Sequence, residues 1–275
     1  MCQSSFFNRW EVADAMIELQ NVSRNFGDKM AVDRIDLVVP RGELFAFLGP
    51  NGAGKTTTIK MLVGLIRPSS GTVRVCGHDV VRATRETNRR IGYVPDEPHL
   101  YDKLTGREFL RFIADMYGLG SSLSAERIAR EIEGFELESF VDDLTESYSH
   151  GMKQRTVFAA ALLHDPEVLV VDEPMVGLDP LGVRLVKDQL SSRAASGTTV
   201  FISTHTLSMA EEIAGRIGII SQGRLRFVGD ISALRNELSM RDGKLESLFL
   251  ELLSGGNGKA DIVVKPTEAT APSKF

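Results

Sequence analysis

The stretch that most constrains this chain is a glycine-rich octapeptide at residues 49–56, Gly-Pro-Asn-Gly-Ala-Gly-Lys-Thr. It has the form G-x-x-x-x-G-K-[ST], in which glycines let backbone N–H groups turn inward around phosphate oxygens. The apolar run 44–48 before it indicates a buried strand, and residues 56–65 after it indicate a helix. Because the pattern needs that strand-loop-helix setting, the sequence predicts a phosphate-binding loop in an α/β fold.

The chemistry of each group in this loop predicts its role. The N-terminus of the following helix adds partial positive charge where phosphates would lie. Lys55 is expected to reach the β- and γ-phosphates of a nucleotide, and the Thr56 hydroxyl is expected to bind Mg²⁺. The nucleotide-binding residues expected in this stretch are Gly49, Pro50, Asn51, Gly52, Ala53, Gly54, Lys55, Thr56 and Thr57.

Composition limits the number of domains and the classes of partner that this chain can have. With 43% hydrophobic and 25% charged residues, the 275-residue chain has enough apolar material for one large domain or two modest ones. Its net charge of −5 gives no electrostatic indication of a nucleic-acid partner. No apolar run is long enough for a membrane-spanning helix or a signal peptide. Two cysteines and five scattered histidines indicate neither a disulfide framework nor a metal site, so a reducing compartment is expected.

Hydrophobic periodicity changes along the chain. Strand-like residues 16–25 and 30–39 are separated by a Gly-Asp turn, which predicts an antiparallel hairpin. From 96 to about 147 the pattern is helical, and residues 105–108 form a capping box. The continuous apolar run 168–171 is typical of a parallel strand covered on both faces.

These changes predict an α/β fold: a P-loop NTPase (RecA-like) core with a mostly parallel sheet, an N-terminal antiparallel β subdomain and an inserted α-helical subdomain. The expected segments are a flexible leader at 1–15, the β subdomain and the first part of the core at 16–95, the helical subdomain at 96–155, the second part of the core at 156–230, a C-terminal helical segment at 231–253 and a disordered tail at 254–275.

Two adjacent carboxylates, Asp172 and Glu173, follow the apolar strand 168–171. Ligands bind at the carboxyl ends of strands in an open α/β sheet. On an extended backbone the two side chains point in opposite directions, so we expect them to have different roles. Asp172 is expected to bind Mg²⁺, directly or through a water molecule. Glu173 is expected to face the γ-phosphate and polarise the attacking water.

With these motifs in view, residues 16–253 resemble the ATP-binding subunits of ABC transporters. Residues 149–155, Ser-His-Gly-Met-Lys-Gln-Arg, resemble the signature of that family, which is usually Ser-Gly-Gly-Gln or a near variant. Residues 177–180, Gly-Leu-Asp-Pro, look like its D-loop at the dimer interface. Residues 203–205, Ser-Thr-His, look like its switch histidine. The order of these motifs is more specific than any one of them.

The resemblance implies roles for further residues. Ser149 and Gly151 would bind the γ-phosphate held by another subunit. Phe26 would stack on the adenine, and His205 would contact the γ-phosphate. The catalytic residues expected on this basis are Glu173, His205 and Lys55.

Two positions depart from the family pattern. Residues 93–95, Tyr-Val-Pro, are followed by Asp96, where members often have Gln. Asp96 can still accept a hydrogen bond from a metal-bound water, so we expect it in the metal site with Thr56 and Asp172. His150 replaces a signature glycine, and its side chain is expected either to crowd the partner's phosphate or to contact it. The residues expected to carry hydrolysis are retained, so an active ATPase is predicted.

The resemblance also implies how such a chain works. It would be a motor subunit with ATP and Mg²⁺ as cofactors, and two chains would close on ATP and open after hydrolysis. The pair would be a homodimer or would include a related ATPase subunit. A separate transmembrane permease would dock near residues 96–105, which places the chain at the cytoplasmic face of the membrane as a peripheral protein. Residues 98–108 and 149–152 resemble the ABC-2 exporter branch, whose members handle drugs, antibiotics, ions or lipids.

Two alternatives remain open at this stage. A soluble ABC-type ATPase could act on ribosomes or DNA, but translation-type members join two modules and DNA-type members carry long coiled coils. This chain has one module and neither addition, and no nucleic-acid partner is expected. A P-loop kinase or other phosphotransferase would explain the phosphate-binding loop but not residues 149–151 or His205.

Overall fold

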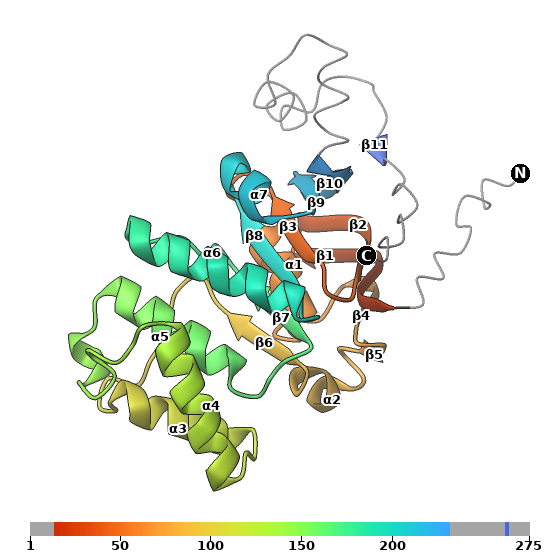
Figure 1. The fold of residues 1–275 in the computed structure, drawn as a ribbon. Coiled ribbons are helices and arrows are strands. Elements are labelled where there is room, and N and C mark those ends of the chain that lie inside the picture. Colours follow the sequence, from red (N-terminus) through yellow and green to blue (C-terminus); the bar gives the residue numbers. More distant parts are fainter. Residues whose placement is uncertain (1–13, 232–261, 264–275) are drawn as a thin grey trace, which may run out of the picture.

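The structure is a computed structural model that describes residues 14–231 and 262–263, and it contains two sheets with helices around them (Figure 1). The larger sheet has seven strands in the order β11-β10-β9-β3-β8-β7-β6. The strands from β9 to β6 in that order are mutually parallel, whereas β10 pairs antiparallel with β9. The strands are β3 (Leu44–Leu48), β6 (Ile91–Val94), β7 (Val168–Val171), β8 (Thr199–Thr204), β9 (Arg216–Ser221), β10 (Arg224–Asp230) and β11 (Ile262–Val263).

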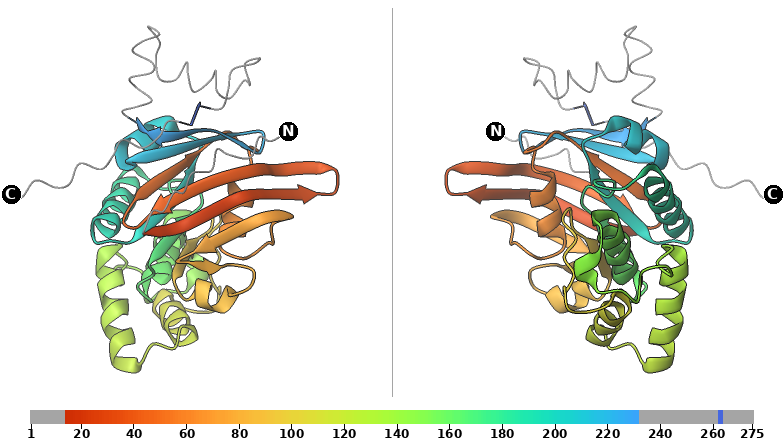
Figure 2. Two further views of the ribbon diagram at one scale, coloured as in Figure 1. Left: turned by 90° about the vertical axis from the view of Figure 1, so that its right-hand side faces the viewer. Right: turned by 90° about the vertical axis from the view of Figure 1, so that its left-hand side faces the viewer.

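The smaller sheet is antiparallel and has the strand order β2-β1-β4-β5. Its strands are β1 (Ala15–Phe26), β2 (Lys29–Pro40), β4 (Ser70–Val75) and β5 (His78–Asp79). The predicted hairpin is confirmed, because Phe26 pairs with Lys29 across a turn in which Gly27 has a φ of +57°. Figure 2 shows this long hairpin lying across the molecule, beside β9 and β10 and away from the helices α3 and α4.

The parallel strands are apolar throughout because both of their faces are covered. Every residue of β3 is buried, but alternate side chains enter different cores. Leu44, Ala46 and Leu48 pack with α3–α7, whereas Phe45 and Phe47 pack with α1 and the antiparallel sheet. The period of two in a strand therefore places one core on each face of the sheet. The mostly parallel sheet and the antiparallel subdomain agree with the fold class predicted from the sequence.

The helices fall on the two faces in the same way, with α1 between the sheets and α5 and α6 along the opposite face (Figure 1). The predicted capping box is confirmed at α3, where the Thr105 side chain accepts from the Glu108 N–H at 3.2 Å and the Glu108 carboxylate accepts from the Thr105 N–H at 2.8 Å. The helices are α1 (Lys55–Leu62), α2 (Thr84–Asn88), α3 (Gly106–Met116), α4 (Ser121–Gly134), α5 (His150–Leu162), α6 (Pro180–Ala195) and α7 (Leu207–Ile213), with a 3₁₀ turn at Thr145–Ser147.

A buried ion pair joins the helical insert to the core. The Glu131 side chain of α4 is fully buried, and both of its oxygens accept from the Arg193 guanidinium of α6 at 2.8 Å. Arg130 makes a second contact with the same carboxylate at 2.8 Å. These contacts fix α4 against α6, so the insert and the core share a polar interface as well as an apolar one.

The two ends of the chain are where the sequence prediction either differs from the structure or concerns residues that the structure does not describe. Residues 262–263 were expected within a disordered tail, but they form β11 and pair parallel with Phe227 and Val228. Their β-branched side chains favour a strand, which a prediction based on the composition of the whole segment overlooks. The rest of the expected tail, the helical segment predicted after Ile231 and the leader up to residue 13 lie outside the described residues. Within the described ranges, no helix combines the length and apolarity needed to cross a bilayer.

Candidate active site at the carboxyl ends of the parallel strands

The loop between β3 and α1 requires its glycines. Gly52 and Gly54 have φ values of +78° and +112°, which side chains other than glycine rarely adopt. A Cβ atom at Gly54 would lie 2.6 Å from the carbonyl oxygen of Ala31, and one at Gly49 would overlap the carbonyl oxygen of Ile220. The loop therefore lies close against two neighbouring strands and leads directly into α1, as the glycine-rich motif predicts.

Lys55 is the first residue of α1, and its side chain is only 5% exposed. Its ammonium donates to the carbonyl oxygens of Gly49 and Pro50 at 2.7 and 3.2 Å and forms an ion pair with Glu173 Oε1 at 3.2 Å. A buried charge is tolerated only when it is paired in this way. Lys55 thus connects the loop to the acidic pair.

Asp172 is fully buried, and only one of its carboxylate oxygens has a hydrogen-bond partner. The Ser203 hydroxyl donates to Oδ1, whereas Oδ2 has none within the described part of the chain. Burial raises the pKa of Asp172, the hydroxyls of Ser203 and Thr56 oppose that shift, and the charges of Asp96 and Glu173 add to it. A buried, unsatisfied carboxylate oxygen beside a threonine hydroxyl fits a hard cation that prefers oxygen ligands.

Glu173 does not have the extended backbone that its place after the strand predicts. The opposite orientation of the two carboxylates was predicted from an extended backbone, but β7 ends at Val171 and Glu173 has a φ of +48°. The Ser203 hydroxyl accepts from the Glu173 N–H at 3.0 Å and so supports this left-handed conformation. Strained backbone of this kind is concentrated at functional sites because the surrounding structure must hold it.

The Glu173 side chain lies between two basic groups. Its Oε1 faces Lys55, and its Oε2 is 2.9 Å from Nδ1 of His205, which follows β8. The carboxylate is 16% exposed, whereas the His205 side chain is 52% exposed. The structure thus brings together the three residues predicted to be catalytic, with the predicted metal ligands Asp172 and Thr56 beside them.

Asp96 lies near this group, but no hydrogen bond or ion pair joins it to the group within the described part of the chain. It is exposed after β6, and its side chain accepts from the N–H of Glu97 at 3.1 Å. Its charge nevertheless reaches the site, because burial, then Asp172, then Asp96 together raise the pKa of Tyr93 to about 12. Among His, Cys, Asp and Glu of the described residues, no group of three or more is placed to hold a metal.

The remaining predicted residues lie apart from this cluster. Phe26 is 48% exposed at the end of β1, with the Arg24 guanidinium 4.6 Å from its ring centre. Ser149 caps α5 by accepting from the Met152 N–H at 3.3 Å. Within the described ranges, no hydrogen bond or ion pair joins Ser149 or Gly151 to the loop at 49–57. The structure therefore does not bring the signature to the loop of its own chain.

Ser203 has a position in the site that the sequence does not predict. In the sequence it is only the first residue of the Ser-Thr-His motif, yet in the structure it contacts both members of the acidic pair. The signal is the pairing of β7 with β8, in which Val171 lies opposite Ile202. That register brings the next residues of the two strands together, and it becomes visible only when the strand order is known.

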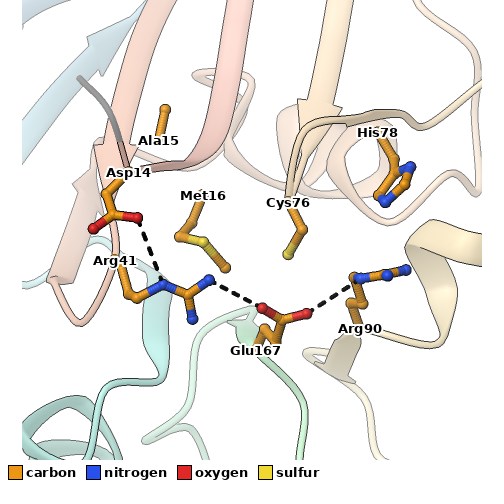
Figure 3. A pocket seen from close by; sticks show the side chains of 8 residues that line it. All are labelled: Asp14, Ala15, Met16, Arg41, Cys76, His78, Arg90 and Glu167. Atoms are coloured by element: carbon orange, nitrogen blue, oxygen red, sulfur yellow. Dashed lines mark hydrogen bonds and ion pairs between the residues drawn. The ribbon is translucent and has the colours of Figure 1, made fainter. Parts of the chain in front are cut away.

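A cavity of about 320 Å³ lies at the amino ends of the strands, away from the candidate site (Figure 3). Its charges are already paired, because Glu167 contacts Arg41 at 3.1 Å and Arg90 at 3.2 Å, and Arg41 also lies 3.9 Å from Asp14. Burial raises the pKa of the Cys76 thiol to about 11, which keeps it protonated and unreactive at neutral pH. The carboxylates and guanidinium groups of this cavity thus pair with one another, and the glycine-rich loop lies at the other ends of these strands.

The glycine-rich loop and the sheet together define a P-loop NTPase. Residues 32–176 match the ABC transporter family. The chain is 37% identical over 243 residues to a probable multidrug ABC transporter ATP-binding protein of Escherichia coli K12, and the match covers 87% of this chain and 42% of that protein. It is 39% identical over 247 residues to the bacitracin transport ATP-binding protein of Enterococcus faecalis, over 87% of this chain and 79% of that protein.

Solved structures agree with the sequence comparisons. An ATP-binding subunit of an ABC transporter superposes with a TM-score of 0.80 at 32% identity, over 86% of this chain and 99% of that one. The chain belongs to the ABC transporter family, and its fold is that of an ATP-binding cassette.

Proposed function

We propose that this chain binds Mg²⁺-ATP and hydrolyses it to ADP and phosphate, as the motor subunit that powers a separate transmembrane permease. The observation that carries the proposal is the position of Glu173 between Lys55 and His205, beside a buried Asp172 oxygen that lacks a partner. All of these groups lie at the carboxyl ends of parallel strands, where α/β sheets bind their ligands.

The donor set suits magnesium. The Thr56 hydroxyl and Asp172 Oδ2 would hold the ion, and Asp96 would contact it through a water molecule. Few protein ligands are needed, because Mg²⁺ keeps several waters and also binds the phosphates of its nucleotide. When bound, the ion would neutralise charge that develops on the phosphates.

The chain's own residues account for the hydrolytic step. The oxygen of water attacks the γ-phosphorus, and the bond to the β–γ bridging oxygen breaks. Phosphate oxygens would draw the Lys55 ammonium away from Glu173, which would free that carboxylate to accept the proton of the attacking water. His205 would hold Glu173 through Nδ1, and its half-exposed ring could also contact the γ-phosphate.

A second chain, identical or related, would complete the site. Ser149 and Gly151 stand at the exposed N-terminus of α5 and do not reach their own loop. A helix N-terminus favours negative charge, so a phosphate presented by another chain would be stabilised there. Two chains placed head to tail would then enclose two nucleotides, with Phe26 against the adenine.

The permease would dock beside the helical insert. Tyr101, in the predicted docking segment 96–105, is 58% exposed and packs edge to face with Phe112 of α3 at 5.5 Å. Exposed aromatic groups of this kind suit a protein partner. The names of the relatives, which include multidrug and bacitracin transport proteins, support an exporter at the cytoplasmic face of a membrane. They do not favour the ribosome- or DNA-directed alternative.

Glu173→Gln tests this proposal in the purified full-length chain. We expect ATP binding to remain while phosphate release falls roughly 100-fold or more, because a glutamine cannot accept the proton. The matched control is Glu138→Gln, which changes an exposed glutamate remote from the loop and should leave turnover unchanged. Unchanged turnover in Glu173→Gln would remove Glu173 from the mechanism. A wild-type chain that neither binds nor hydrolyses ATP would overturn the proposed function itself.

A further inference from the structure

His150, the residue that replaces a signature glycine, contacts the segment after the acidic pair. Its Nε2 lies 3.2 Å from the carbonyl oxygen of Val176. A carbonyl can only accept, so Nε2 must carry the proton, as it does in the imidazolium and in one neutral tautomer. The ring also lies against Gly177, where a Cβ atom would overlap it. Gly177 has a φ of +76°, so both its conformation and its neighbour require glycine.

The same segment is connected by its backbone to Glu173. The Val176 N–H donates to the Glu173 carbonyl oxygen at 3.3 Å, and the Leu178 N–H donates to that of Met175 at 3.4 Å. Val176 therefore bonds Glu173 through its N–H and His150 through its carbonyl. One residue links the predicted general base to the predicted signature.

Packing supports the polar contact. A Cβ atom at Gly151 would stand 3.6 Å from Leu178 Cδ2, so the first turn of α5 is already in van der Waals reach of this segment. Ser149 caps the same turn, because its hydroxyl accepts from the Met152 N–H at 3.3 Å. Residues 149–151 thus contact residues 176–178 within a single chain.

We propose that His150 is a positioning residue that couples the signature to Glu173 through Val176. The side chain neither crowds nor reaches for a partner's phosphate, the two possibilities that the sequence left open; it anchors the turn that carries the general base. When the nucleotide of a second chain binds at Ser149, the first turn of α5 and the turn at 173–178 would move together. This inference rests on the proposed ATPase function.

Kinetics of the full-length chain provide the first test. We expect His150→Ala to lower kcat for ATP about 5-fold, the effect of losing one net hydrogen bond, with the dissociation constant for Mg²⁺-ATP unchanged because the loop at 49–57 is untouched. His150→Gln places an amide N–H near the same carbonyl and should restore kcat to within about 2-fold of wild type. The matched control His78→Gln removes an imidazole from the opposite edge of the sheet and should change neither quantity.

Amide hydrogen exchange provides a second test that does not depend on hydrolysis. His150→Ala should speed exchange at the Val176 and Leu178 amides about 5-fold, and His150→Gln should not. Gly177→Ala should impair the chain less in the His150→Ala background than in wild type, because the ring that the new methyl group would overlap is gone.

The outcomes separate the two proposals. Additive effects of His150→Ala and Gly177→Ala, with exchange at the wild-type rate, would overturn the coupling. A loss of ATP affinity equal to the loss of kcat would assign His150 to binding instead of positioning. If the wild-type chain fails to hydrolyse ATP while His150→Ala still speeds exchange, the contact stands and the proposed function fails.

Discussion

At the scale of single residues, one hydroxyl bonds the carboxylate of Asp172 and the backbone of Glu173. Ser203 donates to Asp172 and accepts from the Glu173 N–H, so it orients the predicted metal ligand and the predicted base together. Residues that orient metal ligands in this way commonly matter nearly as much as the ligands. Loss of such a residue is expected to lower the affinity for the metal more than the stability of the fold.

Ser203→Ala tests this role. We expect the Mg²⁺ concentration that gives half-maximal ATP hydrolysis to rise about 10-fold or more, because Asp172 loses the group that orients it. A magnesium titration of phosphate release measures this shift. The control Ser196→Ala removes an exposed hydroxyl at the end of α6, whose partner is a backbone carbonyl, and should leave the titration unchanged. Superimposable titrations for wild type and Ser203→Ala would exclude the role.

The sequence predicts some of these residues and not others for a physical reason. The positions of Lys55 and Thr56 follow from a local pattern, because the loop and the helix after it are consecutive in the chain. The left-handed conformation of Glu173 and the double contact of Ser203 depend on which strand lies beside β7. That pairing joins residues about thirty positions apart, so no local pattern reveals it.

At the scale of elements, the helical insert is held to the core through the buried carboxylate of Glu131. Arg193 supplies two of its hydrogen bonds from α6, and Arg130 supplies another from α4 itself. Removing one partner of a buried ion pair costs more than the pair contributes, because the remaining charge stays buried. The interface should therefore be sensitive to Arg193 and insensitive to exposed charges on the same helix.

Arg193→Ala should lower the free energy of unfolding by about 3 kcal/mol, as expected when a buried carboxylate loses its main partner. Denaturant titration of the full-length chain measures the change. The control on the same helix is Arg184→Ala, whose exposed i,i+4 pair with Asp188 spans 3.9 Å and should contribute less than about 0.5 kcal/mol. Equal effects of the two substitutions would contradict the proposed importance of the α4–α6 ion pair.

Glu43, in the connection between β2 and β3, makes stability depend on pH. Burial raises its pKa to about 7, although Arg216 at 3.2 Å opposes the shift, and Asp230 adds to it. The folded state then holds a proton that the unfolded state, with an ordinary glutamate pKa near 4.5, releases. The stabilisation is therefore complete below about pH 4.5 and is lost as the pH rises through 7.

Glu43→Gln should flatten this part of the stability profile, because an amide does not titrate. Unfolding free energies measured at pH 5, 6, 7 and 8 should fall with pH in wild type and fall less in the variant. Glu138→Gln, an exposed change, should keep the wild-type slope. If Glu43→Gln also keeps that slope, another group carries the pH dependence.

The sequence predicts some secondary-structure elements correctly and misses others. The β1–β2 hairpin and the cap of α3 follow from residues that are close in sequence, and both are confirmed. The β11 strand was missed because two β-branched residues, Ile262 and Val263, lie in a segment whose overall composition favours disorder. Pairing with β10 supplies the partner that such a short strand needs.

At the scale of the whole molecule, the larger sheet has one core on each face, and the candidate site lies at the carboxyl ends of its parallel strands. The changes in hydrophobic periodicity and the strand-loop-helix setting of the glycine-rich loop predict this fold class, because both are local features of the sequence. The family resemblance implies that the signature acts on the nucleotide of another subunit, and within the described residues no hydrogen bond or ion pair joins Ser149 to the loop of its own chain. The proposal therefore has to be tested with two chains.

ATP-dependent dimerisation tests whether the signature acts on a second chain. In a Glu173→Gln background, we expect Mg²⁺-ATP to convert single chains into dimers that size-exclusion chromatography resolves. Ser149→Glu should abolish dimers without weakening ATP binding, because its charge repels the partner's phosphate and not its own. Lys55→Ala should abolish dimers by removing the loop's own contact with the nucleotide. Ser196→Glu, which adds the same charge at an exposed helix end, should dimerise normally.

Mixing the two defective chains then distinguishes action within a chain from action between chains. In a head-to-tail pair, the loop of the Ser149→Glu chain meets the signature of the Lys55→Ala chain, so one of the two sites is complete. We therefore expect dimers in the mixture and in neither chain alone. If Ser149→Glu dimerises by itself, or if the mixture stays as single chains while Ser196→Glu dimerises, the signature does not bind the nucleotide of a second chain. The site would then have to be completed by something other than another cassette.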